Sequence, residues 1–432
     1  MERRNFLGLG LLAGLAAGVS PAARRLLHAQ PMPPSSAIEP YAGRFFLFIN
    51  AGGGWDPTMV CDPKGGDINR QFMPSAIGTT GPFSYAPISF TDSGRTLSNQ
   101  QFFEKFRDRL LVLNGVDMQT NNHDTGTRYT WSGHLEDGYP PLAAILAASL
   151  APGRPLGFLS NGGYENTVGV APLTRLNDIN TIARIARPNR PDPNNAMVQY
   201  HSTATLDRIQ RAQNQRLAAM TAAQTLPTWQ LSMRQLLETR GGGNLLERLM
   251  MFLPTNEVLN RATNPILKQG LVAIAAYRAG VSAAANLAVG GFDTHGNHDA
   301  TQGTALGRIL SGVDLLMDHI DEMGLRDRVT VMVGSDFGRT PQYNAQNGKD
   351  HWSVTSILMM GAGIRGGRVV GASDDRFRAR GLDFASLTPS DTATRKLNPK
   401  SIHMALRRLA GVEASEAARQ FPIYGDNISL FE

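Results

Sequence analysis

Five short apolar runs occur along the chain, and each has the length of a β-strand. They are nearly continuous instead of alternating with polar residues, which predicts strands buried on both faces of a sheet. Glycine or polar residues close each run, as expected where a strand ends in a turn. The runs span residues 45–51, 110–116, 283–289, 329–333 and 354–360.

Apolar residues at helical spacing lie between these runs. Residues 102–109 and 140–150 predict helices, and a long amphipathic helix precedes the strand at 329–333. Because that helix connects two strands, it indicates a βαβ unit of an α/β sheet. The Ala-, Gln-, Leu- and Arg-rich segment 203–280 also has helical spacing, and we interpret it as a helical insertion or cap.

The length of the chain allows a substantial core. Its 432 residues, 42% of them hydrophobic, can form one large α/β domain or two smaller ones. We divide the chain into an export signal (1–30), a linker (31–42), the first part of an α/β domain (43–202), the helical insertion (203–280) and the second part of the domain (281–432).

The N-terminus has the features of a twin-arginine export signal. Residues 3–7 read Arg-Arg-Asn-Phe-Leu, and the apolar segment 8–19 that follows is too short to span a bilayer. A signal anchor retained on the protein is the alternative, although Pro-rich sequence follows directly. We expect cleavage near Ala29 and a mature protein in the periplasm or outside the cell.

Composition argues against two classes of partner. The net charge of +6 falls to +3 without residues 1–30, which hold four arginines and one glutamate, and no basic stripe interleaved with aromatics indicates nucleic-acid binding. No second apolar segment is long enough for a membrane span after signal cleavage. Cys61 is the only cysteine, so no intrachain disulfide can form, and we interpret it as a small buried hydrophobe.

Aspartate and histidine residues follow several of the predicted strands. In open α/β sheets, ligands bind beyond the carboxyl ends of the strands, so we expect these side chains to meet there. Carboxylate and imidazole donors favour zinc, with calcium, magnesium or manganese as alternatives. The predicted ligands are Asp56, Asp293, His295, Asp336 and His351.

Each of these residues also has a structural interpretation. The glycines before Asp56 could form a phosphate-binding loop, but they lack the Gly-Lys-Ser/Thr ending of a P-loop. Asp336 could cap a helix, and His351 could be a core histidine beside Trp352. Their joint placement at strand ends favours the metal site.

A catalytic nucleophile and an anion-binding residue are also candidates. Thr125 and Thr127 follow a strand at the start of a predicted helix, with His123 beside them, where a hydroxyl nucleophile would be stabilised. The alternative is that Asp124, Thr125 or Thr127 caps that helix. Arg339 could clamp an anionic substrate, because a guanidinium matches phosphate and sulfate oxygens.

Three motifs, in this order behind a twin-arginine signal, give a family resemblance. They are Gly-Phe-Asp-Thr-His at 291–295, Ser-Asp-Phe-Gly-Arg-Thr at 335–340 and Asp-His-Trp at 350–352. Together they resemble a family of exported bacterial proteins of unknown function within the alkaline phosphatase and sulfatase superfamily, over residues 45–409. The resemblance implies a three-layer α/β/α sandwich and an exported hydrolase that acts on an anionic small-molecule ester of phosphate or sulfate.

The resemblance also implies roles for individual residues. In the superfamily, two divalent ions assist attack by a Ser, Thr or modified Cys nucleophile on the ester. Asp56 would be the first-strand ligand, Asp293 and His295 would bind the second ion, and Asp336 and His351 would be the strand-terminal acid and the late histidine. Thr125 or Thr127 would fall near the place of the nucleophile.

The chain departs from the superfamily pattern at three positions. Phe337 stands where many superfamily hydrolases have a metal-binding histidine, and Asp336 stands where the family usually has Glu. The Asp293–His295 spacing is shorter than usual, and His298 could supply the missing ligand. The alternatives to a two-ion hydrolase are therefore a single-ion site and a catalytically inactive member of the fold that serves as a periplasmic binding or assembly protein.

Overall fold

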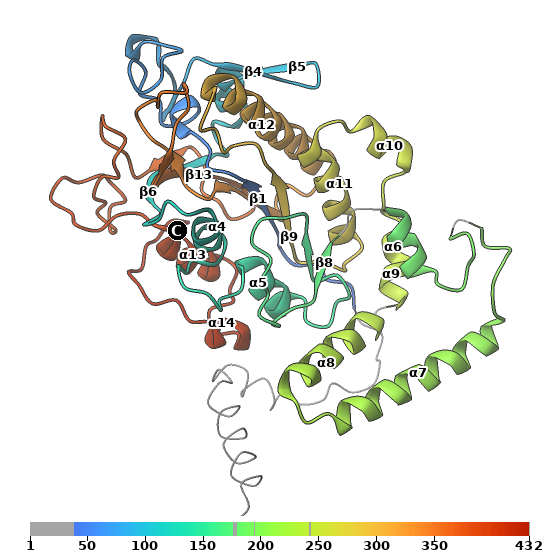
Figure 1. Cartoon of the computed structure of the whole chain (residues 1–432). Coiled ribbons are helices and arrows are strands. Elements are labelled where there is room, and N and C mark those ends of the chain that lie inside the picture. The colour runs from blue at the N-terminus through green and yellow to red at the C-terminus, as the bar shows by residue number, and fades with distance from the viewer. Residues whose placement is uncertain (1–38, 176–178, 194, 242, 432) are drawn as a thin grey trace, which may run out of the picture.

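A computed structural model describes residues 39–175, 179–193, 195–241 and 243–431 (Figure 1). The predicted export signal and most of the predicted linker lie outside the described residues. Within the described part, the main sheet has eight strands in the order β14-β6-β13-β10-β1-β9-β7-β8. These strands are β1 (Phe45–Ala51), β6 (Leu111–Asp117), β7 (Phe158–Ser160), β8 (Leu173–Arg175), β9 (Ala284–Val289), β10 (Val329–Ser335), β13 (Val354–Gly361) and β14 (Arg368–Val370).

All five predicted strands are present, and the central one explains why their sequences are continuously apolar. Every residue of β1 is buried, because the strand lies between β9 and β10 and is covered on both faces. Phe45, Leu47 and Ile49 enter one hydrophobic core, whereas Phe46 and Phe48 enter a second core on the opposite face. A strand that separates two cores has no solvent-facing side chains, so the pattern does not alternate.

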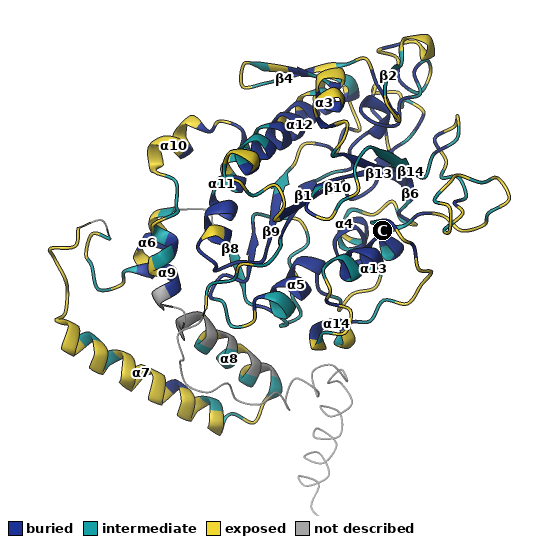
Figure 2. Cartoon of the chain, turned by 180° about the vertical axis from the view of Figure 1, so that it is seen from behind, coloured by how far each residue is buried: buried dark blue, intermediate teal, exposed yellow. Residues whose placement is uncertain are grey.

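Helices cover both faces of this sheet, which confirms the predicted three-layer α/β/α sandwich (Figure 2). One core packs α3 (Asn99–Phe106), α11 (Pro265–Arg278) and α12 (His298–Glu322) against the sheet. The other core packs α4 (His123–Ser132), α5 (Leu142–Leu150) and α13 (Pro399–Leu409). Among these, α12 is the long helix predicted between two strands.

The predicted insertion contains helices of two kinds. Helices α7 (Thr203–Ala223) and α8 (Pro227–Gly241) pack mainly on each other, and α7 is exposed along most of its length (Figures 1 and 2). By contrast, α11 packs on α12 and β9 as part of the sandwich. The helical layer thus begins before residue 281. The other helices of the insertion are α9 (Gly243–Met250) and α10 (Asn256–Arg261), and α6 (Ile179–Ala186), which precedes the insertion, packs on α9.

The remaining elements of the described chain are short. Residues 62–100 contain two hairpins, β2 (Gly78–Thr80) with β3 (Phe83–Tyr85) and β4 (Ser89–Asp92) with β5 (Arg95–Ser98). A two-stranded ribbon pairs β11 (Gly338–Arg339) with β12 (His351–Trp352). The others are η1 (Pro57–Met59), η2 (Pro74–Ala76) and α14 (Glu416–Gln420). None of the described helices is long and apolar enough to cross a membrane.

Candidate metal centre

The register of the three central strands brings three loops together. Ala51, the last residue of β1, is paired with Ser335 of β10 on one side and with Val289 of β9 on the other. Because the three strands are parallel, the segments that follow them leave the sheet at the same edge. Those segments carry most of the residues that the sequence predicted as ligands.

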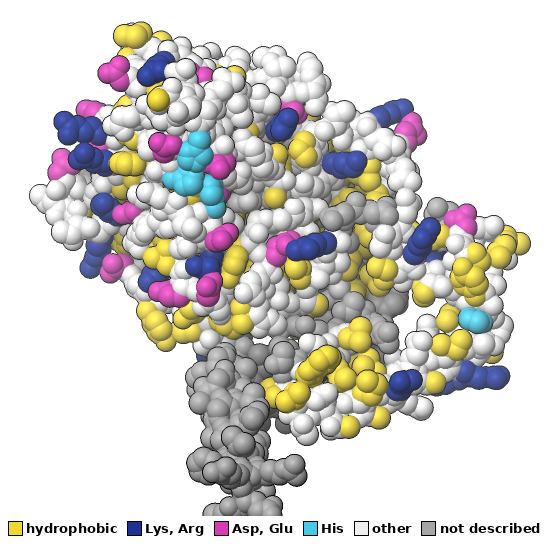
Figure 3. Space-filling view, in the orientation of Figure 1, with side chains coloured by type: hydrophobic (Ala, Val, Ile, Leu, Met, Phe, Trp, Pro, Cys, Tyr) yellow, Lys and Arg dark blue, Asp and Glu magenta, His cyan; other side chains and the backbone are white. Residues whose placement is uncertain are grey.

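Three side chains converge at this edge in a way that suits a metal ion. Ligand atoms of His123, Asp293 and His351 all lie within 4.8 Å of one another, the one such group found in the described residues. Asp293 Oδ2 lies 3.5 Å from His123 Nε2, and Asp293 Oδ1 lies 3.3 Å from His351 Nε2. His123 Nε2 is buried and has no hydrogen-bond partner. An orphaned imidazole nitrogen beside a carboxylate and a second imidazole fits a divalent ion. Figure 3 shows a group of histidine side chains at the surface among acidic ones.

Asp336 orients His123 from behind. Its Oδ2 lies 2.6 Å from His123 Nδ1, and the backbone N–H of Gly53 donates to the same carboxylate at 3.0 and 3.1 Å. This hydrogen bond raises the pKa of His123 against the effect of burial. Because Nδ1 is bound by Asp336, Nε2 is the nitrogen that faces Asp293. In metal sites, a carboxylate that binds the other ring nitrogen commonly fixes the tautomer of a ligating histidine in this way. Asp336, which was predicted as a ligand, contacts the cluster through His123.

His351 and His295 lie side by side at the cluster. The Nδ1 atom of His351 contacts the carbonyl oxygen of Asn121 at 2.8 Å, which turns Nε2 toward Asp293. His295 Nε2 lies 3.1 Å from Asp293 Oδ1 and 2.9 Å from His351 Nε2. On its other side, His295 Nδ1 contacts Asp350 Oδ1 at 2.8 Å, and hydrogen bonds from His295 and Asn344 lower the pKa of Asp350. His295 is thus a half-exposed imidazole held by a carboxylate next to the cluster.

Arg339 holds Asp293 from inside the protein. Its guanidinium is fully buried and donates to Asp293 Oδ1 at 2.7 Å. The other donors reach the carbonyl oxygens of Gly54 at 2.8 Å, of Lys349 at 3.0 Å and of Gly53. Burial alone would raise the pKa of Asp293, but the hydrogen bond and charge of Arg339 lower it overall. The guanidinium has no exposed donor, so binding of a substrate anion, the role predicted for Arg339, would require these bonds to open.

Asp56 lies apart from this cluster, in a fully buried site of its own. Its Oδ2 contacts Lys349 Nζ at 2.6 Å and His298 Nε2 at 3.0 Å, and its Oδ1 accepts from the backbone and hydroxyl of Thr58. Burial opposes ionisation, but the charge of Lys349 and the bond from His298 hold the pKa of Asp56 well below its usual range. Neither Asp56 nor His298, the alternative ligand, is one of the three clustered residues.

The candidate nucleophiles lie on the first turns of α4. The side chain of Asn122 caps this helix by accepting from the backbone N–H of Thr125 at 3.0 Å, so the cap is neither Asp124 nor a threonine. Thr125 Oγ1 accepts from Arg128 at 3.5 Å. Thr127 follows His123 by four residues and therefore lies on the same face of α4. The nucleophile role of both threonines remains a prediction.

The sequence indicates that His123 lies beside the candidate nucleophiles, but it does not identify His123 as a metal ligand. The signal was present, because α4 begins shortly after the carboxyl end of β6, where the strand-end rule already applied to the aspartates. The strand-end rule predicts only the edge of the sheet at which ligands bind. It does not predict that Asp336 contacts the ring of a histidine from another segment instead of the metal ion.

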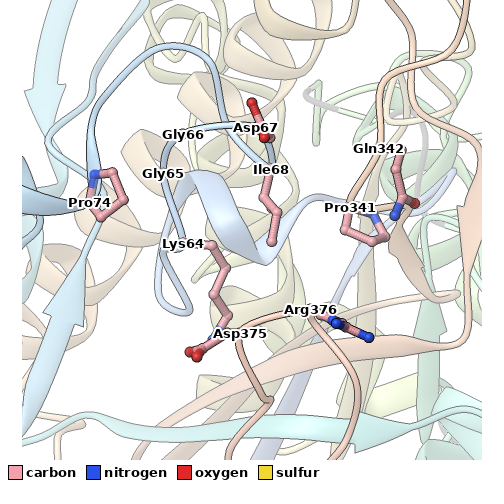
Figure 4. A pocket seen from close by; sticks show the side chains of 10 residues that line it. All are labelled: Lys64, Gly65, Gly66, Asp67, Ile68, Pro74, Pro341, Gln342, Asp375 and Arg376. Carbon is pink, nitrogen blue, oxygen red and sulfur yellow. The ribbon is translucent and has the colours of Figure 1, made fainter.

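A pocket lies beside the β11–β12 ribbon. It has a volume of about 640 Å³ and is lined partly by Pro341 and Gln342, which follow β11, and by Arg376. Residue 376 precedes Phe377, whose carbonyl oxygen accepts from the indole of Trp352 in β12 at 2.7 Å. Figure 4 shows that the lining also includes charged side chains of both signs, among them Lys64 and Asp375.

Comparisons with known proteins give distant structural matches. A sulfatase from Pseudoalteromonas sp., PsFucS1, is 10% identical, with a TM-score of 0.38, and the match covers 90% of this chain and 72% of that one. A 2-O GAG sulfatase is 10% identical, with a TM-score of 0.33 and coverages of 87% and 73%. A TAB5 alkaline phosphatase mutant with Mg bound in its M3 site is 8% identical, with a TM-score of 0.33 and coverages of 75% and 93%.

Likenesses this weak establish neither a reaction nor a substrate, and the architecture rests on the strand pairing and helix packing of this chain. A search of curated proteins finds no match. A family model, in contrast, matches residues 46–410, nearly all of the sandwich and the whole of the candidate centre. The chain therefore belongs to the family described as "Protein of unknown function (DUF1501)".

Proposed function

We propose that this protein binds a divalent metal ion through His123, Asp293 and His351 and hydrolyses phosphate or sulfate esters. One observation carries the metal site: the buried, unpartnered Nε2 of His123 faces the carboxylate of Asp293. Two imidazoles and one carboxylate with an open side form the donor set of a catalytic zinc site. The same oxygen and nitrogen donors admit manganese, magnesium or calcium with a poorer match.

The surrounding residues hold the three ligands in place. Asp336 fixes the tautomer of His123, and Arg339 fixes the carboxylate of Asp293. Such supporting contacts reduce the entropy lost when a ligand set closes around an ion. A divalent ion bound here would polarise an ester oxygen and neutralise charge on the transferring group.

His295 is placed to move a proton. Its Nδ1 is held by Asp350, and its Nε2 lies at the cluster within 3.1 Å of Asp293. A half-exposed imidazole oriented by a carboxylate can accept a proton from an attacking hydroxyl or donate one to a leaving oxygen. The hydroxyl would come from Thr127, from Thr125 or from water.

The pocket beside the β11–β12 ribbon would hold the part of the ester that is not transferred. Its lining includes Pro341 and Gln342, which follow the strand that carries Arg339, and mixes cationic, anionic and apolar groups. Such a lining favours a polar organic group over a free anion. We therefore expect the substrate to be a small organic ester and not inorganic phosphate or sulfate.

The second candidate is a binding or assembly protein without catalysis, acting in the periplasm if the predicted export signal is used. The insertion favours it, because large apolar side chains are exposed there, including Trp229 at 58% and Leu226 at 51%. Exposed apolar groups that form a contiguous patch commonly mark a protein contact. This candidate predicts metal binding without turnover of any ester.

Metal analysis of the purified protein tests the proposal. After loading with zinc and removal of excess, we expect about one ion per chain in the wild type and none in His123→Ala or His351→Ala. His201→Ala is the matched control, because His201 is an exposed histidine just before the helical insertion. Retention of a full equivalent by both cluster variants would overturn the site. Hydrolysis of aryl phosphate and aryl sulfate esters by the loaded wild type then separates the enzyme from the binding protein.

A further inference from the structure

Beside the candidate centre lies a closed cluster of charges that the proposed chemistry does not use. Asp56, His298 and Lys349 have side chains that are 0% exposed. Lys349 Nζ and His298 Nε2 both contact Asp56 Oδ2, at 2.6 and 3.0 Å. His298 Nδ1 contacts Thr294 Oγ1 at 2.7 Å. The cluster thus contains one buried carboxylate, one buried ammonium and one imidazole.

The ammonium occupies the place at Asp56 that a metal ion would need. The other carboxylate oxygen, Oδ1, accepts two hydrogen bonds from Thr58, at 2.9 and 2.7 Å. An unpaired carboxylate in such a site would be strongly unfavourable or would attract a cation. Lys349 supplies that cation from the chain itself.

The backbone of Lys349 ties this cluster to the candidate centre. Its N–H donates to the carbonyl oxygen of Thr294 at 3.0 Å, and Thr294 lies between Asp293 and His295. Its carbonyl oxygen accepts from Arg339 Nη1 at 3.0 Å. The next two residues, 350 and 351, provide the carboxylate that holds His295 and the second histidine of the cluster. The backbone hydrogen bonds of Lys349 therefore tie its segment to the segments of the centre that carry Asp293 and Arg339.

We propose that Lys349 acts as a built-in cation. Its ammonium neutralises Asp56 and excludes a second divalent ion from Asp56 and His298. The centre therefore holds a single metal ion. The single-ion count rests on the proposed function, whereas the assignment of Lys349 to Asp56 does not.

Removing the ammonium should open a second metal site. In Lys349→Ala, the carboxylate of Asp56 and the ring of His298 remain buried without a counter-charge, next to the volume vacated by the side chain. A carboxylate and an imidazole with two threonine hydroxyls nearby form a donor set for zinc or manganese. Zinc-loaded Lys349→Ala should bind two ions per chain, compared with one in the wild type. Asp56→Asn/Lys349→Met, in which neither charge remains, should bind one.

Elemental analysis and zinc titration of the full chain test this count, with circular dichroism to verify the fold. Two ions in the wild type, or a folded Lys349→Ala that binds no more ions than the wild type, would overturn the proposal. If Lys349→Ala folds only when zinc is present, the proposal is supported, because the ion then replaces the ammonium. If Lys349→Ala does not fold even with zinc, Asp56→Asn/Lys349→Met decides the question. Folding of this double variant with one bound ion supports the proposal. Folding with two bound ions, or failure to fold, overturns it.

A further variant separates this proposal from the proposed function. Lys349→Ala/His351→Ala should retain one ion at Asp56 while the original site is lost. If the wild type binds no metal, the proposed function fails, yet Lys349→Ala should still gain one ion. If that gain is also missing, the Lys349 proposal fails as well.

Discussion

Arg339 and Asp293 form an ion pair in which only one partner contacts solvent. Their side chains are 0% and 48% exposed, and Arg339 Nη2 lies 2.7 Å from Asp293 Oδ1. Because the guanidinium also satisfies three carbonyl oxygens, its position is fixed by the backbone. The exposed carboxylate therefore takes its position from a buried cation, which is how a half-exposed ligand can be held rigid.

Arg339→Gln should destabilise the protein and weaken metal binding. The shorter side chain cannot reach all of the carbonyl oxygens, and buried acceptors left without donors cost on the order of 3 kcal/mol together. Asp293 would also lose its anchor, so the affinity for zinc should fall. Urea unfolding of the metal-free protein and zinc titration measure the two effects separately.

The control for this variant is Arg261→Gln. Arg261 pairs with Glu257 one helical turn away, but both side chains are more than two-thirds exposed, at 79% and 72%. Exposed pairs of this kind contribute at most about 0.5 kcal/mol. An Arg339 variant as stable as the Arg261 variant would show that the buried guanidinium has no structural role.

Asp336→Asn should weaken zinc binding without abolishing it. The amide can still hydrogen-bond to His123, but it removes the negative charge that makes the ring a better ligand and selects its tautomer. Loss of such a supporting carboxylate typically lowers metal affinity by about 10- to 100-fold. Competition with a zinc chelator measures the change, and the capacity should stay near one ion per chain at saturation.

Asp391→Asn serves as the control for that variant, because Asp391 is an exposed partner of Arg380. It should bind zinc with wild-type affinity. If Asp336→Asn also does so, then either His123 is not a ligand or its orientation does not depend on Asp336. If zinc capacity itself is lost, Asp336 is a direct ligand, as the sequence predicted.

Gly126→Ala should move His123 indirectly. A Cβ atom at Gly126 would lie 2.3 Å from the carbonyl oxygen of Asp336, so α4 could not keep its present distance from the end of β10. We expect a loss of about 1–3 kcal/mol in the free energy of unfolding and weaker zinc binding, because His123 begins the same helix. Gly303→Ala in α12 is the control, since a Cβ there meets its nearest atom at 3.9 Å. Equal stability of the two variants would contradict the close packing of α4.

The hydrophobic pattern made the sheet predictable, because a strand between two cores must be apolar on both faces. The positions of the strand ends likewise predicted that Asp293 and His351 lie at the carboxyl edge of the sheet. It could not assign partners, since these depend on side chains distant in sequence. Lys349 and Asp56 are 293 residues apart, and His123 and Asp336 are 213 residues apart. No local pattern distinguishes an aspartate that faces a metal site from one paired with a lysine or placed behind a histidine.

His403 should make the protein sensitive to acid. It is fully buried, and burial lowers its pKa from 6.5 to about 3, while its ring contacts the carbonyl oxygen of Thr130 at 2.8 Å. Because the folded pKa is depressed, the stability is present above about pH 6.5 and is lost as the pH falls toward 3, by on the order of 3 kcal/mol near pH 4. His403→Gln should be less stable at pH 7 but should lose less stability on acidification. Part of the pH dependence that remains in this variant would come from His134, whose pKa is lowered to about 4 by burial. Urea unfolding at several pH values checks this, with His201→Gln as the control; parallel profiles for the wild type and His403→Gln would show that His403 is not the acid-sensitive group.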